Sequence, residues 1–132
     1  MKTTYDEVWS FFLENCKTTG FDMPKTDEEI YSKIKNGVLH MNNRLRTEYA
    51  CEDTSETINE TLSTDHLLIL VHYIRLIFLI NEKTYFEGLW QPFKKDVGLN
   101  NFNTQIKSLE ASIISEKSEI DMLIRNMEVD FI

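Results

Sequence analysis

The sequence predicts an all-α fold, a bundle of about five helices with a buried central apolar helix and a long C-terminal helix. The composition, 42% hydrophobic and 27% charged, is typical of a globular domain. Four Gly and two Pro in 132 residues leave little material for the turns of a many-stranded β fold. We expect a single domain, with a helical bundle core over 1–102 and a long C-terminal helix with a tail over 103–132.

The starts of the first two helices are marked by capping boxes. A Glu stands three residues after Thr4 and again three residues after Thr26. The first box predicts a helix over about 4–17, and the second predicts a longer helix over about 27–49. Gly37 interrupts the second helix, which indicates either the close approach of a neighbouring helix or a slight kink.

The next segment, 51–64 (CEDTSETINETLST), is polar and acidic, and we predict a loop with a short turn near 58–62. No Lys or Arg occurs from Thr47 to Ile74. Six carboxylates lie in that stretch, on Glu48, Glu52, Asp53, Glu56, Glu60 and Asp65. Two interpretations stay open, a solvated acidic loop and a surface that repels nucleic acid or meets a basic partner. The net charge of −8 argues against tight binding of a phosphate backbone.

A helix over about 65–81 contains the most apolar stretch, LLILVHYIRLIFLI at 67–80. Fourteen helical residues cover roughly 21 Å, and a membrane span needs about 20 apolar residues. Arg75 also lies past the middle of the run, where lipid would make it costly. We therefore expect no membrane span, and we expect a helix buried on nearly all sides by its own chain or by a neighbouring subunit.

His72 and Arg75 are three residues apart on one face of this helix. An unpaired buried guanidinium is expensive, so we expect a buried polar pair with acidic partners from 48–60 or from Glu82. Structural pairing is favoured here over a functional site.

The C-terminal part predicts a short helix from about Thr84 to Pro92, a connection over 96–102 and a long helix over about 103–127. Apolar residues form a heptad seam on the long helix, broken by Glu116, around which we expect exposure or a bend. The seam serves either intramolecular packing or a subunit interface, and it consists of Ile106, Leu109, Ile113, Ile120 and Leu123. The closing EVDFI is either a frayed tail or an inserted one.

No pattern for catalysis or metal binding is found. The chain has no glycine-rich phosphate loop and no H-E-x-x-H, and its three histidines and two cysteines show no metal-ligand spacing. Cys16 and Cys51 are far apart and are expected to be free thiols in a reducing compartment. We predict no enzyme activity, no cofactor and no metal.

The order of these features carries a resemblance. An N-terminal helix (TYDEVWSFFLENC) is followed by FDMPKTDEEIYSKIKNGVLHMNNRL, an acidic linker, the oily helix and DVGLNNFNTQIKSLEASI. Over roughly 3–114 this order resembles the small head–tail connector (portal adaptor) proteins of tailed bacteriophages. The stretch after Ser115 and the arginine inside the oily helix depart from that pattern.

The resemblance implies a structural virion protein in the neck, made in the host cytoplasm. Its subunits would form a homo-oligomeric ring of about twelve copies beneath the portal protein. The ring would extend the DNA channel, pass DNA without sequence-specific binding, and dock the next neck or tail-completion protein. The resemblance also implies that the C-terminal segment docks on the portal, here through Met127, Val129, Phe131 and Ile132.

Two other classes of function are weighed against the connector. One is an acidic helical protein that binds a basic partner, as a nucleic-acid mimic or a regulator. A mimic needs carboxylates spread over an ordered face, whereas the densest acids here fall in a predicted loop. The other is a small helical enzyme, which the missing motifs argue against.

Overall fold

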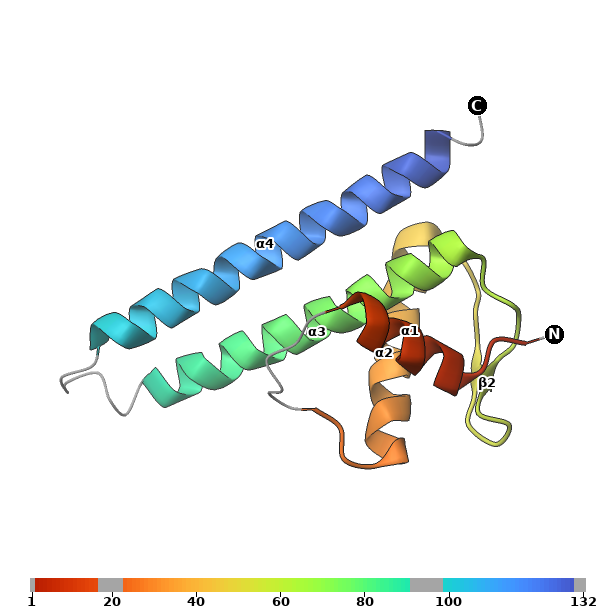
Figure 1. The fold of residues 1–132 in the computed structure, drawn as a ribbon, viewed down its shortest axis with the longest axis horizontal. Coiled ribbons are helices and arrows are strands. Elements are labelled where there is room, and N and C mark those ends of the chain that lie inside the picture. Colours follow the sequence, from red (N-terminus) through yellow and green to blue (C-terminus); the bar gives the residue numbers. More distant parts are fainter. Residues whose placement is uncertain (1, 17–22, 91–98, 130–132) are drawn as a thin grey trace.

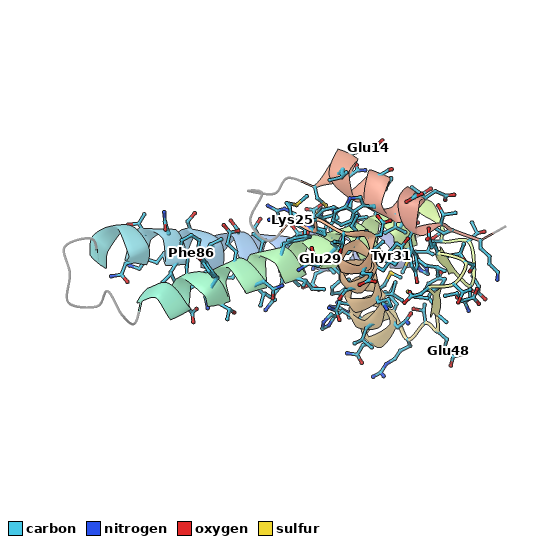
Figure 2. The ribbon with its side chains drawn as sticks, turned by 90° about the horizontal axis from the view of Figure 1, so that it is seen from below. Glu14, Lys25, Glu29, Tyr31, Glu48 and Phe86 are labelled. Carbon is cyan, nitrogen blue, oxygen red and sulfur yellow. The ribbon has the colours of Figure 1, made fainter. Side chains whose placement is uncertain are left out.

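The computed structural model describes residues 2–16, 23–90 and 99–129, which are mostly helical, as predicted. The described elements are α1 (Tyr5–Asn15), α2 (Asp27–Leu45), β1 (Cys51–Glu52), β2 (Thr57–Ile58), α3 (Thr64–Trp90) and α4 (Leu99–Val129). The two long helices α3 and α4 lie antiparallel, and the other elements gather around the first half of α3 (Figure 1). Two regions result. The arm is the helix pair 80–90 and 99–112, which projects from the rest of the described chain, the body (Figure 2).

The described residues form four helices, so the prediction of about five is wrong in one place. The helices expected over 65–81 and from Thr84 are one continuous helix, α3. The polar turn between them supports the helix because Lys83 pairs with Glu87 one turn later at 2.8 Å. Pro92 and residues 96–98 of the expected 96–102 connection lie outside the described residues. The prediction is wrong for residues 99–102, which already belong to α4.

The two N-cap residues that the capping boxes predicted are confirmed. The side chain of Thr4 accepts a hydrogen bond from the Glu7 amide at 3.1 Å, and α1 begins at Tyr5. Thr26 caps α2 in the same way. The second helix ends at Leu45, a few residues earlier than predicted, because Arg46 adopts a left-handed conformation at φ 59°.

The predicted 51–64 loop contains a small antiparallel hairpin, β1 paired with β2. The hairpin holds the start of α1. The Ile58 amide donates to the Thr3 carbonyl at 2.8 Å, and the Tyr5 amide donates to the Glu56 carbonyl at 2.9 Å. Ile58 is fully buried and joins the core, while the acids of the segment, Glu52, Asp53, Glu56 and Glu60, stay exposed on an ordered hairpin.

Gly37 marks the point where α2 crosses α3. A Cβ at this position would lie 2.8 Å from Ile74 Cγ1 and 3.0 Å from Leu70 Cδ1. Of the two readings of this glycine, the structure shows the close approach, and α2 runs through it without interruption.

The apolar helix α3 lies at the centre of the body, where α1, α2 and α4 pack against it. By length and composition alone, Thr64–Gly88 is apolar enough to cross a membrane, a test that core helices also pass. The surrounding helices identify its first half as a core helix. Only 39% of the most apolar window is buried, so the chain leaves part of this helix uncovered.

Candidate functional site

A buried polar cluster joins α3 to α4 in the body. Glu116 of α4 is only 3% exposed, and its two carboxylate oxygens have different partners on α3. One oxygen hydrogen-bonds to His72 Nδ1, and the other accepts from the Arg75 guanidinium. The expected buried pair therefore meets one shared acid. That acid is Glu116 of α4 and lies neither in 48–60 nor at Glu82, where we expected it.

The spacing of the three residues explains how one carboxylate serves two partners. His72 and Arg75 are three apart, so both side chains point from the same face of α3 towards α4. Ile113 and Ile120 lie one heptad position to either side of Glu116 and are buried. The predicted exposure or bend at Glu116 is wrong, because α4 is continuous there and the polar break faces inwards.

Cys16, at the end of α1, lies beside this cluster. Its thiol donates to the Val71 carbonyl at 3.6 Å. Burial raises the pKa of the thiol to about 12, and the nearby Glu116 carboxylate acts in the same direction. The thiol is therefore protonated at neutral pH and is a poor nucleophile.

A second polar network ties the hairpin to α1 and α2. The buried Tyr5 hydroxyl donates to Asp53 Oδ1, and Lys35 Nζ donates to Asp53 Oδ2, each at 2.8 Å. The bond from Lys35, followed by that from Tyr5, lowers the pKa of Asp53. A hydrogen bond to Glu56 raises the pKa of Tyr31, on α2, to about 12. The hairpin acids thus belong to an ordered surface.

A hollow of about 250 Å³ lies between α2, α3 and α4. It is lined by Arg44, Tyr73, Leu76, Lys117, Ile120 and Asp121. Arg44 pairs with Asp121 at 2.9 Å, and the His40 ring stacks on Tyr73. Lys117 is exposed and has no side-chain partner within the part of the chain that the structure describes.

The histidines do not come together. His66 Nδ1 hydrogen-bonds to the Tyr49 hydroxyl at 2.7 Å, while His40 stacks on Tyr73 and His72 binds Glu116. Among residues 2–16, 23–90 and 99–129, no group of three or more His, Cys, Asp or Glu side chains is arranged to hold a metal ion.

The predicted interface residues of α4 lie along α3 inside one chain. Ile113 and Ile120 are buried, and the half-buried Leu109, Leu123 and Met127 pack on the same core. Ile106, in the arm, is also half-buried. Val129 is the last residue of α4, while Phe131 and Ile132 lie outside the described residues.

Comparison with known proteins places the chain in a family. Residues 1–129 match the family described as YomZ prophage protein. The chain belongs to the YomZ prophage protein family. It is 51% identical over 130 residues to the SPbeta prophage-derived uncharacterized protein YomZ of Bacillus subtilis (strain 168), which covers 98% of this chain and 99% of that relative. No solved structure matches it.

Membership of the YomZ family confirms the phage origin that the resemblance implied, at the level of a prophage. Sequence reasoning singled out His72, Arg75 and Glu116 separately but did not pair them. The available signal was a polar break in the seam of one helix together with a polar edge on the most apolar helix. The hollow at Arg44 and Lys117 gave no signal, since it combines three helices distant in sequence.

Proposed function

We propose that this YomZ-family protein is a head–tail connector subunit, a structural virion protein that forms a ring beneath the portal. The ring extends the DNA channel and docks the next component of the neck. The observation that carries the proposal is the shape of the chain, a packed body with a projecting two-helix arm (Figure 2). Membership of a prophage protein family supports it, because connector subunits are phage proteins.

The arm supports the proposal because it leaves apolar surface uncovered. Ile80 and Tyr85 in the arm are 41% and 50% exposed, and Ile114 at its base is 66% exposed. Uncovered apolar side chains on a rigid helix pair are typical of surfaces that neighbouring subunits bury. In the body, by contrast, residues 66–79 of the same helix are all buried or half-buried.

The charge of the chain also suits a channel. A net charge of −8 repels the phosphates of passing DNA and prevents tight binding.

Co-purification with the portal protein of the same prophage tests the proposal. The full chain should bind portal rings and appear in electron micrographs as a ring of added density on the portal axis. Ile114→Glu should weaken assembly at least tenfold, because it places a charge in an apolar contact. Ser108→Glu, an exposed change on the same helix, should leave assembly unchanged.

A monomer in isolation does not decide the question, because a connector subunit can await its portal before it assembles. Portal rings that never retain the chain, at any protein ratio, would refute the connector role. The circular dichroism of both variants should match that of the parent chain.

An acidic binding protein is the second candidate, and one observation favours it. The hairpin acid Asp53 is held by Tyr5 and Lys35, whereas the sequence predicted a loop. An ordered acidic face suits a basic protein partner. Retention of a basic host protein by the chain, lost in salt and absent for portal rings, would favour this function over the connector.

A further inference from the structure

The hollow between α2, α3 and α4 combines an apolar floor with positive charge. Leu76 and Ile120, which form its floor, are buried side chains, and Tyr73 contributes an aromatic wall. Arg44 and Lys117 against Asp121 give the lining a net charge of +1 (two cations less one carboxylate). This local charge is opposite in sign to the chain as a whole, which carries −8.

The two cations differ in what they bind. Arg44 is occupied by Asp121 at 2.9 Å. Lys117 has no partner within the described ranges, and it is an exposed residue of the lining. A ligand with a carboxylate next to an apolar or aromatic group would pair with Lys117 and cover the floor.

The sequence beyond α4 has this chemistry. Val129 ends α4 and is followed by Asp130 and Phe131, a carboxylate next to an aromatic ring. We infer that the hollow of one copy receives the Asp130–Phe131 segment of a second copy. In this contact Asp130 pairs with Lys117, and Phe131 lies against Tyr73 and the apolar floor.

The segment cannot occupy the hollow of its own chain. Lys117 precedes Val129 by twelve residues, which is roughly 18 Å along a helix axis. One further residue of extended chain carries Asp130 only about 3.5 Å beyond Val129. The segment would also have to reverse direction to approach Lys117. The contact is therefore made between two copies.

The symmetry of such a contact favours a ring. The segment that is donated and the hollow that receives it are different surfaces of one chain, so the contact is heterologous. Heterologous contacts close into rings when the rotation between copies allows it. This inference rests on the proposed ring, and it gives the C-terminal segment a neighbouring subunit as its partner in place of the portal.

A labelled peptide tests the inference without any portal. The probe is an acetylated, fluorescent peptide of residues 127–132 (MEVDFI), and the receptor is the full chain at a dilution where it is monomeric. Fluorescence anisotropy should show saturable binding. Lys117→Glu should weaken binding at least tenfold, because the peptide carboxylates then meet a carboxylate. Lys107→Glu, an exposed lysine of the same helix outside the hollow, should change it less than twofold.

A charge swap gives a second measurement. A peptide with Asp130→Lys should bind the parent chain weakly and should recover its affinity for the Lys117→Glu chain. Absence of saturable binding, or equal effects of the two lysine variants, would overturn the inference. If the peptide binds as expected while portal rings fail to retain the chain, the tail contact holds and the connector role fails. If portal rings retain the chain but the peptide does not bind, the reverse is true.

Discussion

The body and the arm are built on the same helix, yet their packing differs. In the body, α3 is covered by α1, α2 and α4, and Ile69, Leu70, Val71 and Ile74 are completely buried. In the arm, α3 and α4 pack on each other with no third described helix beside them, and Ile80 and Tyr85 remain exposed. The apolar run of α3 is almost uniform in sequence. The helices that pack around each part of α3 therefore decide whether that part is a buried core or a surface available to partners.

The largest loss of stability should come from a substitution in the polar cluster of the body. Glu116→Ala removes the buried acid that the partly buried Arg75 guanidinium and His72 imidazole share, so we expect the free energy of unfolding to fall by about 3 kcal/mol. Urea titration followed by circular dichroism measures this loss. The control is Glu110→Ala in the arm, whose exposed pair with Lys83 should contribute less than about 1 kcal/mol.

If Glu116→Ala and Glu110→Ala lowered the free energy of unfolding equally, the buried cluster would contribute no more to stability than a surface ion pair. Glu116→Leu sharpens the result. It fills the seam with an apolar side chain, so part of the stability should return relative to Glu116→Ala even though the acid is absent from both variants.

Substituting Ala for the glycine of the body and for that of the arm should change the free energy of unfolding by smaller amounts and in opposite directions. Gly37→Ala in the body places a Cβ against Ile74 and should lower the free energy of unfolding by about 1 kcal/mol, because crowding outweighs the gain in helix propensity. Gly88→Ala in the arm meets no atom within 4 Å and should raise it by about 0.5 kcal/mol. Hydrogen exchange measures the change locally in each region. Stabilisation by both substitutions would contradict the close crossing of α2 and α3.

The smallest effect concerns the hairpin, which belongs to the body through Asp53. The folded chain lowers the pKa of this carboxyl, so its contribution is present above its unfolded pKa of about 3.9 and is lost as the pH falls through the lower folded value. Asp53→Asn should therefore lower the melting temperature slightly at pH 7, and this deficit should disappear at an acidic pH below the folded pKa of Asp53. Thermal melts at both pH values measure this difference. A deficit of the same size at both would argue against the ionised contact with Lys35.

The helices were predictable because their signals are local. The Thr4 and Thr26 boxes and the apolar periodicity fix where α1 and α2 begin. The hairpin was not predictable, since its pairing involves Thr3 and Tyr5, some fifty residues earlier in the chain. The continuity of α3 through Lys83 was also missed. Lys83 pairs with Glu87 one turn later and with Glu110 on α4, and the second pair depends on the fold.

The candidate site was half predictable. Each of His72, Arg75 and Glu116 is conspicuous as a polar residue in an apolar pattern. Their meeting depends on how α4 returns along α3, which no local pattern specifies. The Arg44 and Lys117 hollow depends on the same return and on the crossing of α2, so only the folded chain brings its lining together.

The shared acid has a consequence for the dimensions of the molecule. Displacing α4 along α3 by one heptad would put Leu109 or Leu123 opposite His72 and Arg75 and move Glu116 about 10 Å away from them. Neither displacement leaves Glu116 beside its two partners, so this contact favours one alignment of the two helices. Glu116 therefore fixes the register of α4 on α3, and this register sets how far the helix pair projects from the body.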